Sequence, residues 1–255
     1  MLKQNMHIHS KHSWDSNMSL EIISSELIEK GIYYAGITDH IEFSHETLPY
    51  VLTNLKIRNE EIDKLNDKYK GKIKLLKGVE ISSPHLYKDK VDALRVMDID
   101  YIIGSIHSID KTPKTSLAKK QATYKYYEEM LKMIKANQID VVGHIDYINR
   151  YYDGDYTDYN QLAKLFALMK QNNIITEINT SAQRRNAKQA FFPSLDKIKL
   201  YSKTSDKIII GSDAHESHEL FDDLDKANYI ARYNDLKPVI FEKRKMKEMK
   251  PPTYS

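Results

Sequence analysis

The chain of 255 residues contains no cysteine and a single tryptophan, Trp14. Without cysteine it can form no disulfide, thiolate nucleophile or sulfur-based zinc site, so any metal must be bound by nitrogen and oxygen atoms. No apolar run approaches the ~18 residues of a membrane span. The first twenty residues include histidines and an aspartate, unlike the apolar core of a signal peptide. We therefore expect a cytoplasmic protein that does not bind membranes.

The chain also has little excess of positive over negative charge, since its formal net charge is only +3. So small an excess does not indicate a nucleic-acid partner. The basic run at residues 242–250 precedes two prolines and is interpreted as a solvated strand end and tail. The length suits one large α/β domain or two ordinary domains, but the chain contains neither a low-complexity linker nor a repeat. We therefore expect one domain spanning residues 1–255.

Short apolar runs alternate with longer amphipathic runs along the chain. The short runs predict strands at 5–9, 34–40, 73–82, 100–108, 140–146, 174–181 and 207–215, with a possible late strand at 238–244. The longer runs predict helices at 19–31, 55–71, 123–138, 159–172, 193–204 and 218–233. This alternation at ~30-residue intervals is typical of a parallel sheet built from βαβ units. Seven units favour an α/β fold with a closed or nearly closed barrel, whose functional groups lie at the C-terminal strand ends.

The stretch MHIHSKHSWDS, residues 6–16, is the first sign of chemistry. His7 and His9 lie two residues apart on a predicted strand, so their side chains point to the same face. Two adjacent imidazoles are awkward in an apolar core but natural as a metal chelate. An isolated pair of this kind can also be structural, so the metal hypothesis requires further ligands from elsewhere in the chain.

Every other predicted strand also ends in a possible metal ligand. With the first pair, these residues are His7, His9, Asp39, His40, Glu80, His107, His144, Asp146, Glu177, Asn179, Asp213 and His215. Their convergence on one barrel mouth favours a metal site over a set of structural histidines. One catalytic zinc takes about three protein ligands, so we expect two or three divalent ions, either zinc, manganese or iron. Clustered ions lower the pKa of a bridging water to about 7 and suit in-line hydrolysis of phosphate esters.

The motifs HIHSKHSWDS, ITDH, GVEIS, GSIHS, GHIDYINRY, EINTS and GSDAH, in this order, resemble those of the PHP (polymerase and histidinol phosphatase) superfamily. The stretches GHIDYINRY, EINTSAQRR, FFPSLDKIKL and VIFEKRK are similar to those of its monofunctional histidinol-phosphatase branch. The resemblance covers nearly the whole chain. It implies a distorted (β/α)7 barrel, related to the TIM barrel, with a three-metal site at the C-terminal ends of the strands.

The resemblance also implies an assignment of nine ligands to three ions. The first ion is expected at His7, His9, Glu80 and Asp213, the second at Glu80, His107 and His144, and the third at Asp15, His40 and His215. Asp15 follows the first strand and is absent from the strand-end set. The remaining strand-end residues become supporting groups that orient the ligands; they are Asp39, Asp146, Glu177 and Asn179.

The activity implied by the resemblance is hydrolysis of L-histidinol phosphate to L-histidinol and phosphate, in histidine biosynthesis. The expected mechanism is attack by a metal-bridging hydroxide. Catalytic roles are expected for Glu80, Asp213 and His215.

Two arginines, Arg150 and Arg184, follow the fifth and sixth strands, where a planar guanidinium suits phosphate oxygens. The alternative for each is a surface salt bridge, and the sequence does not separate Arg184 from Arg185. An amine and an imidazole beyond the phosphate would need acidic or aromatic partners. The loops offer Glu42, Asp110 and Trp14.

Three other functions remain open at this point. The first is a PHP phosphoesterase with another substrate, such as a sugar phosphate, nucleotide or phosphotyrosine, because the loop SSPHLYKDK matches no family pattern. The second is a C–N hydrolase on a similar barrel, which GSIHS disfavours because such enzymes usually place a bridging lysine on the fourth strand. The third is a metal-binding module without activity, which the complete set of ligands disfavours.

Overall fold

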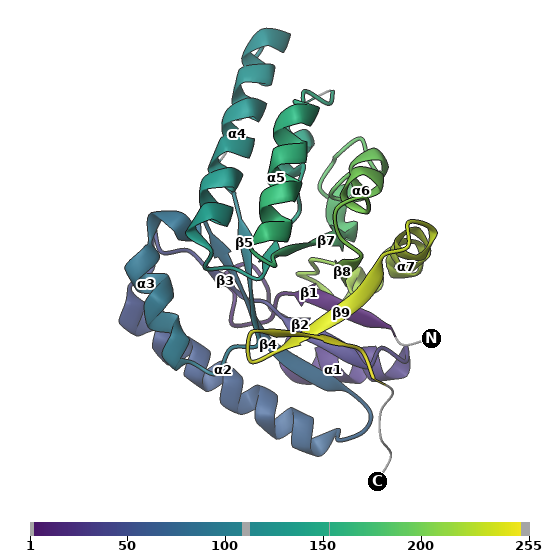
Figure 1. Ribbon diagram of the computed structural model, residues 1–255. Coiled ribbons are helices and arrows are strands. Elements are labelled where there is room, and N and C mark those ends of the chain that lie inside the picture. Colours follow the sequence, from purple (N-terminus) through teal and green to yellow (C-terminus); the bar gives the residue numbers. More distant parts are fainter. Residues whose placement is uncertain (1–2, 109–112, 153, 251–255) are drawn as a thin grey trace.

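The computed structural model describes residues 3–108, 113–152 and 154–250 of the chain. Seven parallel strands form its centre, and helices pack around their outside (Figure 1). In sheet order the strands are β1 (Gln4–Ile8), β2 (Tyr34–Ile37), β4 (Lys74–Ser82), β5 (Tyr101–Ser105), β6 (Val141–Val142), β7 (Ile175–Asn179) and β8 (Lys207–Gly211). All seven coincide with predicted strands, although β6 retains only two residues of the expected 140–146.

Six of the seven helices in the described residues overlap the predicted amphipathic runs, whereas the short helix at residues 88–93 was not predicted. The seven are α1 (Leu20–Glu29), α2 (Leu48–Lys68), α3 (Lys88–Ala93), α4 (Ser116–Ala136), α5 (Tyr159–Gln171), α6 (Leu195–Tyr201) and α7 (Leu224–Tyr233). Single 3₁₀ turns are η1 (Pro84–Leu86), η2 (Leu94–Val96), η3 (Tyr147–Arg150), η4 (Thr180–Ala182) and η5 (Ser217–Glu219). At the start of α1 the Ser19 side chain accepts a hydrogen bond from Ile22 N, so Ser19 is the N-cap of this helix. α2 begins before the predicted residue 55, because Pro49 is tolerated in its first turn.

The interior of the barrel is filled by apolar side chains from every parallel strand. They are Met6, Tyr34, Leu76, Tyr101, Ile103, Val141, Ile175 and Ile209. The Tyr101 hydroxyl donates a hydrogen bond to the carbonyl of Met6 over 2.6 Å. Gly36 makes room for this crossing ring, since a Cβ there would lie 1.6 Å from the hydroxyl oxygen. The interior is therefore a packed core, and it supports the site from below.

Strands β1 and β8 meet at their C-terminal ends. Ile8 and Ala214 form a parallel bridge, His9 N donates to Ala214 O over 2.9 Å, and Asp213 N donates to His7 O over 2.7 Å. At its other end β8 pairs instead with β9 (Lys237–Glu242). The junction of β1 and β8 places two histidine-bearing segments side by side. The predicted α/β fold with a parallel sheet is confirmed, and a single bridge joins β1 to the segment after β8.

A C-terminal hairpin crosses the opposite end of the barrel. In it β9 pairs antiparallel with β10 (Lys245–Glu248), and Figure 1 shows β9 lying across the other strands. The ring of Phe241 stacks on that of Tyr101 at 5.8 Å between centroids, and Arg244 forms an ion pair with Asp140, which precedes β6. The basic run expected as a strand end and tail thus forms a hairpin that covers the N-terminal strand ends.

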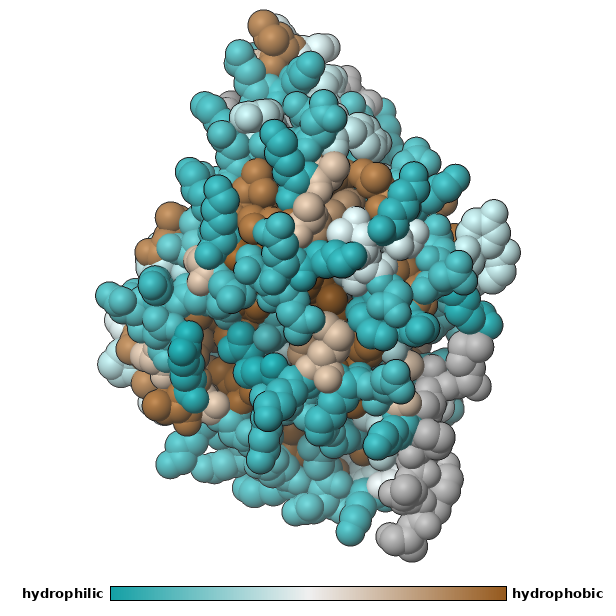
Figure 2. All heavy atoms as spheres, viewed as in Figure 1, coloured by the Kyte–Doolittle hydropathy of each residue, from teal (hydrophilic) through white to brown (hydrophobic). Residues whose placement is uncertain are grey.

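The face shown in Figure 2 carries mostly hydrophilic side chains, with apolar ones scattered between them. Exposed large apolar residues such as Val96 and Tyr233 come from separate elements, and such scattering is normal for a protein surface. Among the described residues, no helix combines the length and apolarity that a membrane span requires.

Candidate metal centre

His7 and His9 lie at the end of β1 and are fully buried. Their Nε2 atoms are 3.2 Å apart, as expected from the alternation of side chains along a strand. His7 Nδ1 lies 2.9 Å from Glu177 Oε2, and His9 Nδ1 lies 3.2 Å from Ser13 Oγ. Each ring is thus held through Nδ1 while Nε2 faces the other ring, which is the arrangement of an imidazole held ready for a metal.

Glu80, near the end of β4, lies between two groups of histidines and is buried. Its Oε2 is 3.3 Å from His7 Nε2 and 3.0 Å from His40 Nδ1. Its Oε1 is 2.8 Å from His144 Nε2 and 3.3 Å from His107 Nε2. One carboxylate therefore serves two sides of the site, which is the geometry required of a residue that bridges two ions.

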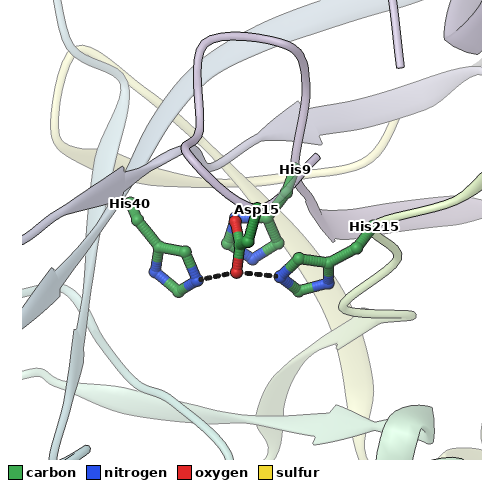
Figure 3. Close-up of side chains that lie close together, drawn as sticks. All are labelled: His9, Asp15, His40 and His215. Atoms are coloured by element: carbon green, nitrogen blue, oxygen red, sulfur yellow. Dashed lines mark ion pairs between the residues drawn. The ribbon is translucent and has the colours of Figure 1, made fainter. Parts of the chain in front are cut away.

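Asp15 forms the third group with His40 and His215 (Figure 3). Its Oδ2 lies 3.0 Å from His215 Nε2 and 3.4 Å from His40 Nε2. The ring of His9 lies against both histidines, at 4.2 Å between centroids in each case. Figure 3 shows Asp15, from the loop after β1, between the rings of His40 and His215 and in front of that of His9, so a loop residue completes a group otherwise built from strand ends.

All nine predicted ligands come together at the C-terminal end of the barrel. Within the described residues they fall into groups whose donor atoms lie within 4.8 Å of one another: His7, His9 and Asp213; Glu80, His107 and His144; and His9, Asp15, His40 and His215. These nitrogen and oxygen donors, without sulfur, fit a divalent cation such as zinc, manganese or iron. The proximity is a finding, whereas the role of each residue stays a prediction.

The carboxylates of the site favour charged histidines despite their burial. Burial lowers the pKa of His40, but the Glu80 and Asp15 carboxylates outweigh it and raise this pKa to about 10. Burial likewise opposes charge on His107, whereas Glu80 and Glu42 raise its pKa to about 9. Both imidazoles therefore carry protons at neutral pH, and a divalent cation would have to displace them.

Two other groups already have the ionisation state of a ligand. Burial, together with the imidazoles of His40 and His215, holds the pKa of His9 well below its usual value. Burial alone would raise the pKa of Glu80, but the adjacent imidazoles, His7 first among them, hold it well below the usual range. His9 is thus neutral and Glu80 ionised, as metal ligation requires.

The supporting residues act in different ways. Glu177 reaches two ligands, because Oε2 contacts His7 while Oε1 accepts a hydrogen bond from His144 N over 2.7 Å. Asp39 accepts hydrogen bonds from Ser10 N and Ser10 Oγ, at 2.6 and 3.0 Å, and so fixes the start of the loop that carries Asp15.

Asn179 acts through Ser181, whose hydroxyl oxygen lies 2.7 Å from Asn179 Oδ1 and 3.0 Å from Asp213 Oδ2, so its one proton is shared between these two acceptors. Asp146 faces away from these ligands and pairs with Lys197, at 2.5 Å between Oδ1 and Nζ. Three of the four supporting residues therefore stabilise the centre directly or through one neighbour, and Asp146 belongs to a separate network.

A cavity of about 320 Å³ opens above the donors. Seven of the nine predicted ligands line it, and only His7 and His9 lie beneath. Arg150 also lines it, with its guanidinium 4.9 Å from the ring centre of Tyr147 and 5.0 Å from that of Tyr151. Trp14 lies at the edge with 78% of its surface exposed. The cavity thus joins anionic, cationic and aromatic groups around one opening.

The two adjacent arginines after β7 have different surroundings. Arg185 lines the cavity, and its Nη2 lies 2.9 Å from His215 Nδ1. Arg184 does not line it; its Nε is 3.1 Å from Glu219 Oε1, and its Nη2 donates to Ser212 O over 2.6 Å. Arg184 therefore ties the strand end to η5, and its predicted contact with phosphate would require these bonds to break.

Glu42 was expected only as a partner for substrate, but it belongs to the donor cluster as well. It forms a group with His40 and His107, and its Oε1 lies 3.1 Å from His107 Nδ1. The sequence spacing could have predicted this position. Glu42 follows His40 by two residues across the short strand β3 (His40–Ile41), so the two side chains point to the same face. Asp110, the other acidic candidate, lies outside the described residues.

A distorted parallel barrel whose mouth gathers this many nitrogen and oxygen donors defines the class of the protein as an α/β barrel with a candidate metal site at its mouth. The family model described as PHP domain matches residues 5–181. The chain belongs to the PHP domain family. The match ends before Asp213 and His215, which the structure nevertheless brings to the same site.

Full-length relatives extend the comparison beyond that match. The probable histidinol-phosphatase of Clostridium acetobutylicum is 31% identical over 260 residues, covering 94% of this chain and 97% of that protein. The probable histidinol-phosphatase of Thermotoga maritima is 28% identical, covering 84% and 85%. The crystal structure of histidinol phosphate phosphatase from Lactococcus lactis, complexed with zinc, L-histidinol and phosphate, has the same fold, with a TM-score of 0.77 at 20% identity, over 96% of this chain and 99% of that one.

Proposed function

We propose that the chain is a metal-dependent phosphatase that hydrolyses L-histidinol phosphate to L-histidinol and phosphate in the cytoplasm. The observation that carries the proposal is the position of Glu80, whose two oxygens face two groups of histidines at the floor of a cavity that also holds Arg150 and Arg185. The 31% identity to the Clostridium acetobutylicum relative supports this substrate. In this proposal residues 1–255 act as one domain and the partner is a small phosphate ester.

Two or three divalent ions of zinc, manganese or iron are proposed, and each of the three groups of donors is a site for one of them. The sets are His7, His9, Asp213 and Glu80; Glu80, His107 and His144; and Asp15, His40 and His215. Once bound, the ions would supply positive charge to the phosphate oxygens and lower the pKa of a water. The chain's own contribution is to fix the donors in place before the substrate arrives.

In this proposal the arginines at the mouth of the barrel bind the phosphate, and a water molecule, rather than a side chain, is the nucleophile. Arg150 and Arg185 present guanidinium groups to the cavity, and their planar forks suit phosphate oxygens. The chain has no cysteine, and the carboxylates of Asp15 and Asp213 already face imidazoles at 3.0 and 3.3 Å. Direct attack by water therefore fits the site better than a covalent phosphoenzyme. Glu80, Asp213 and His215 line the cavity where the reacting groups would lie.

The two adjacent arginines allow a matched test of phosphate binding. Arg185→Ala is expected to lower kcat/KM for a phosphate ester by about 100-fold, or ~2.7 kcal/mol, because it removes positive charge from the cavity. Arg184→Ala should lower the melting temperature, since its bonds to Glu219 and Ser212 are structural, but keep kcat/KM within a few fold. Steady-state kinetics and thermal unfolding of both variants measure this, and the reverse pattern would return the phosphate contact to Arg184.

Substrate identity is tested by comparing kcat/KM for histidinol phosphate, sugar phosphates, nucleotides and p-nitrophenyl phosphate. We expect histidinol phosphate to be preferred by at least ~100-fold, about 2.7 kcal/mol of transition-state discrimination. The Glu80→Gln variant, purified identically, reveals any contaminating phosphatase. Preference for a sugar phosphate or nucleotide would keep the phosphoesterase chemistry and reject the biosynthetic substrate.

A further inference from the structure

The fully buried Lys197 in α6 belongs to none of the donor groups. Its Nζ lies 2.5 Å from Asp146 Oδ1, 2.7 Å from Thr157 Oγ1 and 3.1 Å from Asp155 Oδ1. These three oxygens match the three N–H donors of an ammonium group. Burying an ammonium costs several kcal/mol unless it is paired and fully hydrogen-bonded. The chain has thus built a complete charged network in its interior, at a place that the proposed chemistry does not use.

Asp146 is the centre of this network and is itself fully buried. Its Oδ1 accepts a second hydrogen bond from the Tyr127 hydroxyl over 2.6 Å, and its Oδ2 accepts from Ser194 N over 3.0 Å. Tyr127 lies on α4 and Ser194 immediately precedes α6. One carboxylate therefore joins the turn after β6 to two helices and, through Lys197, to the segment 155–157.

The turn after β6 needs such a support. His144 has φ +21° and Asp146 has φ +81°, both in the left-handed region without being glycine. Such residues cost about 1–3 kcal/mol each and persist only where the surroundings fix them. The same turn directs His144 Nε2 to within 2.8 Å of Glu80 Oε1 and leads into η3, which carries Arg150 to the cavity.

We propose that the Lys197–Asp146 ion pair is a positioning device that holds the turn at residues 143–150, so that His144 faces Glu80 and Arg150 faces the cavity. The proposal rests on the proposed function only in taking His144 as a metal ligand. Lys197 touches no donor itself and acts through Asp146 and the backbone. Removing the pair should therefore weaken cation binding at Glu80, His107 and His144 while leaving the other donors in place.

The test is titration of the metal-free protein with Co²⁺, followed by its visible absorption, for wild type and Lys197→Met. We expect one class of cobalt site to weaken by about tenfold or more, as for other residues that orient ligands. Lys77→Met is the matched control, because Lys77 is also mostly buried and pairs with two aspartates, Asp63 and Asp98, at 2.6 Å each. It should lower the melting temperature but leave the cobalt titration unchanged. Equal weakening in both variants would overturn the proposal.

A double variant, Lys197→Met with Asp146→Asn, separates positioning from stability. Removing both charges leaves no unpaired buried ion, so this chain should fold even where Lys197→Met does not. Its cobalt site should still be weakened by about tenfold, because the tie between the turn and α6 is gone. If the double variant bound cobalt with the same affinity as wild type, the positioning role would be rejected. The assay uses no substrate, so failure of the phosphatase proposal would show separately, in the substrate panel.

Discussion

Replacing Glu80 with glutamine is expected to lower kcat for phosphate ester hydrolysis by about 10⁴-fold or more, which corresponds to ~5.4 kcal/mol. Within the described part of the chain, Glu80 is the only carboxylate with histidine rings near each of its two oxygens, His7 and His40 near Oε2 and His107 and His144 near Oε1. An amide is neutral and binds cations weakly, so one substitution affects two proposed ions. Phosphate release and metal content per chain measure the effect.

The matched control for this variant is Glu242→Gln. Glu242 ends β9 at the opposite end of the barrel and pairs with Lys74 and Lys247. It receives the same change of charge far from the site, so its kcat and metal content should equal those of wild type. If Glu80→Gln keeps wild-type kcat with a full metal content, Glu80 does not bridge ions and the proposed chemistry is wrong.

Removing the metals is expected to abolish activity and to destabilise the fold. A ligand that binds only the native state at a free concentration 1,000 times its Kd adds about 4.1 kcal/mol per site. At roughly 2–4 °C per kcal/mol for a chain of this size, each restored ion should raise the melting temperature by ~10 °C. Elemental analysis, activity and thermal unfolding after dialysis against a chelator, and again after adding zinc or manganese, measure this. Fewer than two ions per chain with full activity would contradict it.

The stabilisation by metal should grow as the pH rises from 6 to 8. In the metal-free protein the pKa values of His40 and His107 are raised to about 10 and about 9. Their contribution to stability is therefore complete below the unfolded value of about 6.5 and declines as pH rises towards those values. Metal binding must displace these protons, so its affinity rises over the same range. A difference in melting temperature that shrinks with increasing pH would contradict this linkage.

Much of the donor set could be predicted because it follows strand periodicity. His7 and His9 share a face by alternation, and the other strand-end histidines converge because parallel strands of a barrel end at one rim. Asp15 could not be found in this way, since a loop has no period; the resemblance to the superfamily supplied it. Glu42 follows the same alternation as His40, but it lies two residues beyond the end of the predicted strand 34–40.

The arginines and the hairpin lay beyond sequence reasoning for a different reason. Arg184 and Arg185 are adjacent and chemically identical, so only the path of the chain after η4 decides which one meets Glu219 and which one meets the cavity. The partner of Arg244, in the turn between β9 and β10, is equally hard to predict, since Asp140 lies 104 positions earlier in the chain. The local sequence pattern predicts the helices and strands, whereas the partner of a given side chain depends on contacts between residues far apart in the sequence.

The junction between β1 and β8 has a consequence for how the protein folds. Asn5 and Ser212 hydrogen-bond across it although 207 positions separate them in the chain, so the contact is among the most non-local that this sequence can make. Non-local contacts form late, because the entropy of closing the intervening chain must be overcome first. His7 and Asp213 therefore come together only once nearly every strand is in place. During synthesis a ribosome-bound chain that has not yet released residue 213 cannot complete the first donor group, and metal uptake there would mark a chain whose barrel has already closed.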